Sequence, residues 1–599
     1  MEEKYIPLTP AQIAQLTSQG CRAQDWSGVQ VGTGFDASKV CNVAFAGQVR
    51  LGSDVVVTNV RVRLADCVIH RGARVEDVSI LECSGQSSFG IGVQVAAVNE
   101  GGGREVPLHP SMTAQTSYII AMWRHRAAVI EKLLAIIEKE RQAAVSDMCE
   151  IGEGAVVTSC GVLRDVRIGD HAVVTGAQRL ENGTILSSKD APAFVGYAVR
   201  ARDFLFSRAS RVESGSSLHR CFVGQGSLIE EGFTAVDSLF FVNCIMAEGE
   251  ATSIFAGPYT VSHHKATLLI AGMFSFFNAG SGANQSNHLF KTGAVHQGIN
   301  DRGCKYGSNA YVMLPARNGA FTTVLGSHTM HHDTSDFPYS YLMEQEEKSY
   351  LLPGAGLRSW GLVRDLEKWP ARDRRPKEGA ADLINFAPWN PYVTSKVARA
   401  LSVCSGLLAN AGPDTYTYER LKIKSVMLRR GKEIYRLAMD AALGEMFSAK
   451  PEKDLCPEGC GDWIDLGGMF APKRVVYKLM EDIEQGIHLS MHTILRELGR
   501  IHASYPSYAY GWALSQLDPP APSAESTEHP AECLPPASER VMAAIERGKQ
   551  AMKTLQGYAR DDASRDSDMV MATGYGIDSL NPEIREADFK AVRGVDIKK

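Results

Sequence analysis

Histidine and amide side chains gather in one window of the chain, residues 254–333. Seven of the chain's 16 histidines lie there, and they are His263, His264, His288, His296, His328, His331 and His332. A neutral imidazole can accept a proton from a hydroxyl or an amine near pH 7, which few other side chains can do. Further polar side chains of the window supply hydrogen-bond donors and acceptors: Lys265, Asn278, Asn284, Gln285, Asn287, Lys291, Gln297, Asn300, Asp301 and Arg302. The sequence therefore predicts that any chemistry takes place in this window.

The first hypothesis for the window is group transfer with a histidine as general base. We assign the base to His288, with Asn284 and Asn287 as orienting groups and His264 as the second candidate. Backbone amides or Asn side chains would hold the developing oxyanion. The acceptor would be a sugar, a nucleotide sugar or another small polar metabolite. The residues that we expect to contact it are Arg104, Lys265, Lys291, Gln285 and His296.

Two other hypotheses remain open. Histidines from neighbouring turns of the chain could converge on a divalent metal, with His263, His288 and His331 as three ligands and one position left for water. The metal would then be the cofactor. Alternatively, the protein is a non-catalytic ligand-binding or scaffold protein, in which each histidine is hydrogen-bonded within the fold.

A glycine-rich stretch outside the window also has the composition of a binding loop. Residues 99–104 place three consecutive glycines directly before Arg104. Consecutive glycine amides can form an anion-binding concavity, and an arginine can hold a phosphate or a carboxylate with two hydrogen bonds. The stretch is not a dinucleotide-binding loop, because no strand–turn–helix crossover surrounds it. It therefore predicts an anion contact at Arg104.

Short repeats form the elements that must position these side chains. Aliphatic residues recur at steps of five to seven residues, and one clear run is Ile151, Val157, Val162, Ile168 and Val174. A helix would give steps of three and four, and a two-sided strand would give steps of two. A period of six suits a parallel β-helix, in which each short strand points one aliphatic side chain inward. Of the chain's 55 glycines, 35 lie in residues 1–330, where the corners of such coils need them.

The repeats resemble the hexapeptide-repeat superfamily of left-handed β-helix proteins. Three stretches are similar to a more particular group, a bacterial family of unknown function: residues 99–107, residues 254–265 and residues 280–288. The superfamily resemblance implies a left-handed coil and assembly as a homotrimer. It also implies acyl transfer by a histidine in a groove between subunits, with acyl-CoA as the possible donor. Carbonic anhydrases that resemble this fold are the precedent for the metal hypothesis.

The expected fold is α+β, a left-handed parallel β-helix with an inserted long helix and a C-terminal helical region. We expect the following segments: an N-terminal region with the first coils (1–111), an inserted amphipathic helix (112–147), the main β-helix with the candidate site (148–333), an extended wrapping segment (334–390), a helical region (391–515), a proline-rich linker (516–536), and a C-terminal helix and tail (537–599).

Charge and composition exclude several classes of partner and location. With 63 basic and 68 acidic side chains, the formal net charge is −5, and a nucleic-acid surface needs a basic excess. The most apolar stretch, Thr267–Ala279, is too short to span a bilayer. The 13 cysteines are scattered and odd in number, which is typical of reduced thiols. We expect a cytoplasmic protein that binds a small molecule, with no nucleic acid and no membrane span.

Overall fold

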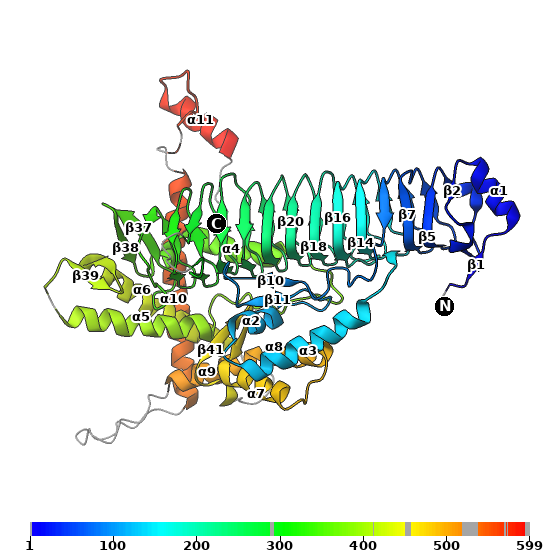
Figure 1. The fold of residues 1–599 in the computed structure, drawn as a ribbon. Coiled ribbons are helices and arrows are strands. Elements are labelled where there is room, and N and C mark those ends of the chain that lie inside the picture. Colours follow the sequence, from blue (N-terminus) through cyan, green and yellow to red (C-terminus); the bar gives the residue numbers. More distant parts are fainter. Residues whose placement is uncertain are drawn as a thin grey trace.

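The computed structural model describes residues 3–287, 293–410, 412–449, 457–517, 537–567, 571 and 573–593. Stacked parallel strands form the body of the molecule, and helices cover one side of the later strands (Figure 1). The predicted α+β class with long parallel stacks is thus confirmed. Within the described ranges, no helix combines the length and the apolar composition that crossing a membrane would require.

Most strands belong to two parallel stacks that alternate along the chain. The first stack contains β1 (Tyr5–Pro7), β2 (Arg22–Ala23), β3 (Val29–Gly32), β5 (Ala44–Leu51), β7 (Arg63–Ile69), β9 (Ile80–Glu82), β12 (Cys149–Ile151), β14 (Val162–Ile168), β16 (Arg179–Ile185), β18 (Arg200–Phe206), β20 (Ser217–Val223), β22 (Thr234–Phe240), β24 (Glu250–Thr252), β25 (Phe255–Ala256), β27 (Leu268–Ile270), β28 (Gly272–Phe274), β30 (Asn284–Ser286), β31 (Gly298–Asn300), β33 (Tyr311–Met313), β34 (Ala316–Asn318) and β36 (Ser327–His328). Among the strands that the structure describes in this stack, only β1 pairs antiparallel, with β3.

The second stack contains β4 (Val40–Cys41), β6 (Val56–Thr58), β8 (Arg74–Glu76), β13 (Val156–Thr158), β15 (Val173–Thr175), β17 (Phe194–Val195), β19 (Arg211–Val212), β21 (Leu228–Glu230), β23 (Ile245–Ala247), β26 (Val261–Ser262), β29 (Asn278–Ala279), β32 (Lys305–Tyr306), β35 (Thr323–Leu325), β37 (Tyr341–Gln345), β38 (Lys348–Leu352), β39 (Thr415–Tyr418) and β40 (Leu421–Lys424). Two antiparallel hairpins lie outside both stacks: β10 (Gln94–Ala96) with β11 (Glu105–Pro107), and β41 (Trp463–Leu466) with β42 (Met469–Pro472).

Each turn of the chain is a coil whose strands pair with those of the next coil. In the regular part, the partner of Val156 is Val173, seventeen residues later. Long strands of the first stack bend in the middle, at residues with positive φ such as Asp165 (53°) and Asp203 (56°). Each coil therefore has three short sides, which explains the predicted six-residue spacing. Interior side chains such as Val157 and Leu163 have no exposed surface, and their burial drives the stacking.

The helices are α1 (Pro10–Ser18), α2 (Ala114–Met122), α3 (Ala127–Ala144), α4 (Trp360–Ala371), α5 (Pro391–Ala409), α6 (Ser425–Ser448), α7 (Lys473–Glu484), α8 (Met491–Ala503), α9 (Tyr505–Leu517), α10 (Ala537–Ser564) and α11 (Pro582–Arg593). Local capping sets several starts. The Asn390 side chain accepts from the Val393 amide at 2.9 Å, and Pro391 occupies the first turn of α5, as expected for a helix start.

The insertion between coils differs from the single helix that we expected over residues 112–147. It contains two helices, α2 and α3, because the chain turns at residues 123–126. Most of α2 is buried, whereas α3 buries one apolar face. A second apolar core fills the space between these helices, the later helices and the outer coil surface, where Leu205, Phe222 and Leu239 lie.

The chain after residue 333 also differs from the expectation. Parallel stacking continues to β37, whose Tyr341 pairs with Thr323, and the segment expected to be extended contains β37, β38 and α4. Residues 415–424, which we expected to be helical, form the hairpin of β39 and β40. β38 pairs antiparallel with β37 and parallel with β40. The β39–β40 hairpin thus supplies backbone partners to the edge of the stack that β38 would otherwise leave open.

Candidate ligand pocket at the junction of the coils and the helical region

A pocket of about 230 Å³ lies where the coils meet α2, α5 and the β41–β42 hairpin. We call it the central pocket. Its apolar wall consists of Met122, Phe255, Met273, Phe274, Ile299 and Ile464, and its polar wall consists of Tyr118, Ser275, Asn300, Asp301, Arg302, Arg317, Tyr392 and Asp465, with Gly467 beside them. Residues from positions 118 to 467 thus share one cavity.

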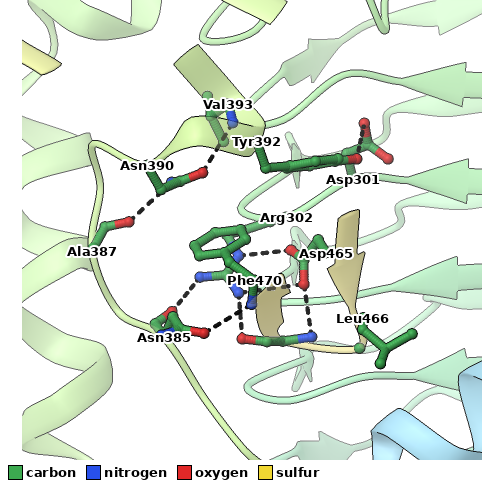
Figure 2. A network of polar contacts seen from close by, with 12 residues as sticks. Asp301, Arg302, Asn385, Ala387, Asn390, Tyr392, Val393, Asp465, Leu466 and Phe470 are labelled. Atoms are coloured by element: carbon green, nitrogen blue, oxygen red, sulfur yellow. Dashed lines mark hydrogen bonds and ion pairs between the residues drawn. The ribbon is translucent and has the colours of Figure 1, made fainter. Parts of the chain in front are cut away.

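Arg302 is the centre of the polar network that holds this junction together (Figure 2). Its side chain is 2% exposed, and its guanidinium lies between the rings of Phe276 and Phe470, at 4.3 and 4.0 Å from their centroids. Arg302 Nε donates to Asp465 Oδ2 at 2.9 Å. The other two nitrogens donate to the carbonyls of Gly468, at 2.7 Å, and Asn385. A buried guanidinium with an acceptor at each of its three nitrogens positions the pocket wall.

Asp301 is the second charged group of the pocket. Its Oδ2 lies 3.3 Å from Lys396 Nζ and 3.7 Å from the nearest Arg317 nitrogen, and it accepts from the Tyr392 hydroxyl at 3.4 Å. The Asp301 carboxylate raises the pKa of Arg317. Burial, followed by the same carboxylate, raises the pKa of Tyr392 well above its usual range. Both groups therefore keep their protons at neutral pH.

The charged side chains that line the pocket balance. Arg302 and Arg317 are cationic, and Asp301 and Asp465 are anionic. Beside the pocket, Lys396 lies near Asp301, and the carboxylate of Asp333 acts on Arg317.

Two residues of the pocket wall carry a polar atom with no hydrogen-bond partner among the described residues. These atoms are Ser275 Oγ and Arg317 Nε. Asn300 Nδ2 also lacks a partner there, but the Asn300 carbonyl oxygen accepts from Tyr306 at 2.8 Å and from Asn318 at 2.9 Å, which places this amide in the coil interior. Each unpaired buried polar group costs about 1–3 kcal/mol unless something fills the pocket and pairs with it. The wall is therefore equipped for a ligand that is rich in hydrogen-bond acceptors.

Four of the residues singled out from the sequence lie together near the C-terminal end of α2. Asn287 Nδ2 donates to Glu100 at 3.0 Å, and Asn287 Oδ1 accepts from the His296 amide at 3.2 Å. The His296 ring lies 6.3 Å from the His331 ring. Arg104 donates to Gln297 at 3.1 Å and to the carbonyl of Ala121 at 2.8 Å. We call Arg104, Asn287, His296 and His331 the histidine rim.

The glycine-rich loop does not have the free donors that the sequence indicated. The Gly101 amide donates to the Ala294 carbonyl at 3.0 Å, and the Gly102 amide donates to the Asn99 carbonyl at 3.0 Å. The Gly103 amide donates to Glu105 at 2.6 Å. Burial lowers the pKa of Arg104. The three glycine amides are thus paired within the chain, one of them with a carboxylate two residues further on, while the anion contact at Arg104 stays a prediction.

Other predicted site residues lie elsewhere. His263 and His264 are exposed neighbours with rings 4.3 Å apart, and Lys265 is beside Glu248 at 3.5 Å. Gln285 is 1% exposed. It points into the coil interior, where it donates to the Tyr306 hydroxyl at 3.3 Å, and it lies apart from the outer coil surface where we expected it to contact substrate.

Asn284 is half-buried on the same strand as Gln285. The sequence assigned the general base to His288 and a substrate contact to Lys291, and both positions lie outside the described residues. His264 and Asn287 lie in different parts of the structure. His264 follows β26, whereas Asn287 contacts the loop that contains Glu100.

The metal hypothesis finds no ligand cluster in the described part of the chain. No group of three or more His, Cys, Asp or Glu side chains there could hold a metal ion. His331 lies in the histidine rim beside His296, while His263 lines a groove under α4. The buried His328 and His332 instead contact Ser349 and Asn318, at 2.7 and 2.9 Å.

Sequence reasoning identified the window but not the pocket. Asn300, Asp301 and Arg302 belong to the polar residues of the window, and three successive polar residues in an aliphatic coil were the available signal. Their partners Tyr392 and Asp465 are distant in sequence, so no local pattern could connect them.

The fold and the pocket define a stacked-coil protein with a cavity where its later helices dock. Residues 5–54 and 51–408 match the family described as a domain of unknown function (DUF4954), and the chain belongs to that family. Residues 449–597 match a second domain of unknown function (DUF6819). An uncharacterized protein of Treponema pallidum (strain Nichols) is 22% identical over 585 residues, which cover 84% of this chain and 80% of the relative. The central pocket draws residues from both matched regions.

Proposed function

We propose that the protein is a group-transfer enzyme whose acceptor is a small anionic metabolite bound in the central pocket. The observation that carries the proposal is the pair of unpartnered donors, Ser275 Oγ and Arg317 Nε, on residues that line the cavity. A carboxylate or a phosphate would accept hydrogen bonds from both.

The size of the pocket supports a small ligand. At about 230 Å³, it is smaller than the ~300–1,000 Å³ typical of sites for drug-sized molecules. The apolar wall, which includes Met273 and Ile299, would contact the carbon skeleton. A hydroxy acid, an amino acid or a sugar phosphate has this combination of size and charge.

The reaction that we propose is transfer of an acyl or related group to a hydroxyl or amine of that metabolite. An imidazole of the histidine rim, His331 or His296, would accept the acceptor's proton as its oxygen or nitrogen attacks the donor's carbonyl carbon. The same proton would then pass to the leaving group, so that protons balance. Support for His331 is that its Nδ1 is buried without a partner in the described structure. Acyl-CoA is the donor class that we propose to test first.

The finer architecture belongs to the same proposal. Coils of seventeen residues with three short sides support a left-handed parallel β-helix of the hexapeptide-repeat type. Assembly as a homotrimer would cover apolar side chains such as Val62 and Tyr197, which are 60% and 66% exposed on the coils. A cytoplasmic location is supported by the eleven free cysteines of the described residues.

Ser275→Ala tests the ligand site. Since Ser275 Oγ is buried without a partner in the described protein, its removal should maintain or raise the thermal stability of the ligand-free protein, while affinity for the metabolite falls about 5–10-fold. The metabolite is first identified by thermal shift with a panel of small carboxylates and phosphates, and calorimetry then gives its Kd. The matched control is Ser262→Ala, which removes another buried, unpartnered hydroxyl outside the pocket. Equal affinity in wild type and Ser275→Ala would reject the central pocket.

His331→Asn separates catalysis from binding. The bound metabolite and acyl-CoA are incubated with the protein, and release of the free thiol is measured. We expect kcat to fall about 100-fold in His331→Asn with little change in KM, as for the loss of a general base. Binding of the metabolite without turnover by the wild type would overturn the transferase and favour a non-catalytic binding protein.

A further inference from the structure

A second and larger hollow lies on another side of the coils. Helix α4 and the following residues 372–374 face the outer surface of β21, β23, β26 and β29, and the space between them measures about 900 Å³. We call it the α4 groove. It adjoins the central pocket, because the ring of Phe276 contacts Arg302 on the pocket side and Trp369 of α4, at 4.3 and 4.8 Å.

The wall formed by α4 carries cations that lack acidic partners. Lys305 and Arg364 both form an ion pair with Asp365, and the distance from Arg364 Nε to Asp365 Oδ1 is 3.8 Å. Within the described ranges, no carboxylate lies within ion-pair distance of the three remaining cationic side chains of the groove, which are those of Lys368, Arg372 and Arg374.

Electrostatics within the groove reflect this imbalance. Burial, followed by repulsion from Arg364 and Arg372, lowers the pKa of Lys368. Burial also lowers the pKa of Arg374. Asp365 and Glu230 attract Lys368 and Arg374, respectively, without forming an ion pair with them. A bound polyanion would relieve the repulsion that remains among the three cations.

The opposite wall of the groove has a different character. It carries the carboxylates of Glu230 and Glu231, which have no ion-pair partner among the described residues, and burial raises the pKa of Glu230. Carboxylates accept hydrogen bonds from hydroxyl groups. The imidazole of His263 and the amide of Asn278 also line the groove.

We propose that the α4 groove binds an organic diphosphate that carries hydroxyl groups, such as a nucleoside diphosphate. The phosphates contact Lys368, Arg372 and Arg374, and the hydroxyl groups face Glu230 and Glu231. Repulsion from the two carboxylates keeps the phosphates at the α4 wall. A volume of about 900 Å³ admits a ligand of nucleotide size. This site is separate from the acceptor site proposed for the central pocket and does not depend on it.

Calorimetry on the full-length protein tests the proposal with ADP and with inorganic pyrophosphate. We expect ADP to bind the wild type, and the double variant Lys368→Gln/Arg372→Gln to bind it at least about tenfold more weakly. The matched control is Lys132→Gln/Lys139→Gln, which removes the same two charges from exposed positions on α3 and should bind as the wild type does.

Three outcomes would overturn the proposal. They are failure of the wild type to bind ADP at millimolar concentration, equal binding by the wild type and the groove variant, and equal weakening in the α3 control, which would mean attraction by net charge alone. Pyrophosphate should bind more weakly than ADP, and equal affinity would contradict a role for the hydroxyl groups. Ser275→Ala should leave ADP binding unchanged, so failure of the central pocket and failure of the groove are distinguishable.

Discussion

At the scale of single residues, the histidines of one sequence window differ in how deeply the fold buries them. His328 and His332 are buried in the coil interior, where burial lowers their pKa values to about 4 and about 3. Their imidazoles are therefore neutral in the folded protein at pH 7. His263 and His264, which follow β26 on an earlier coil, are exposed. Histidines of one sequence window thus differ in exposure, because the fold gives their side chains different access to water.

The buried histidines predict an acid-sensitive stability. The unfolded chain binds protons on histidine below a pKa of 6.5, whereas the folded state keeps His332 neutral. The stability contributed by the neutral form is present above pH 6.5 and is lost as the pH falls. Between pH 7 and pH 5 the loss is about 2 kcal/mol for one such histidine.

His332→Gln should therefore reduce this acid sensitivity by about 2 kcal/mol, because Gln can still donate to Asn318 but cannot titrate. Urea unfolding at pH 7 and at pH 5 measures it. The control is His492→Gln, at an exposed position on α8, which should keep the pH dependence of the wild type. An unchanged pH dependence in His332→Gln would refute this account.

At the scale of elements, α6 and α10 cross where two glycines meet. A Cβ built on Gly548 would lie 2.6 Å from the Gly444 Cα, which is closer than packed atoms allow. Ala544, Ala551 and Leu555 on the same helix are 2–5% exposed. The small residues of this face, Ala544, Gly548 and Ala551, let the two backbones approach each other. The sequence predicted a helix at Ala537–Leu555 but not its partner, because a small-residue strip does not identify the surface that it meets.

Gly548→Val should push α10 away from α6 and destabilise the protein by about 1–3 kcal/mol through overpacking. Hydrogen exchange in α10, together with thermal unfolding, measures the effect. Gly557→Val is the matched control, since it makes the same change in the same helix at a position where a Cβ meets nothing within 4 Å. If both variants lower stability equally, the close crossing is not the cause.

At the scale of the whole molecule, Arg302 joins the coils to the region that matches the second family. Its ion pair with Asp465 and its contact with Phe470 are almost fully buried. Removal of one partner of a buried pair leaves an uncompensated charge, which costs about 3–5 kcal/mol. The docking of residues 463–472 against the coils therefore depends on this side chain.

Arg302→Met should lower the unfolding temperature and separate unfolding into two transitions, with the region after residue 457 unfolding first. Differential scanning calorimetry detects the transitions, and limited proteolysis locates the first of them. Arg302→Met/Asp465→Leu should recover part of the loss, because neither charge is then left unpaired. The control is Arg500→Met, at an arginine that is 60% exposed and paired with Glu497. One transition at the wild-type temperature in Arg302→Met would contradict this role.

The sequence by itself determined the elements whose causes are local. The six-residue recurrence of interior residues such as Val157 and Leu163 follows from coils with three short sides, and each interior position pairs with the positions one coil away. A capping residue and a periodic apolar face predict helices such as α5. Both features lie within about twenty residues of sequence, which is the range over which backbone geometry and burial repeat.

Only the tertiary structure decided where the ligand site lies. The central pocket exists because Tyr118, Arg302, Tyr392 and Asp465 come together from four separate segments, and no periodicity links positions so far apart. Folding also buries Gln285 and His332, and it pairs an amide of the glycine-rich loop with Glu105. From the sequence, Gln285 and the glycine-rich loop were expected to bind a ligand. Residue type determines what chemistry a side chain can do, whereas burial and partners determine whether it is free to do it.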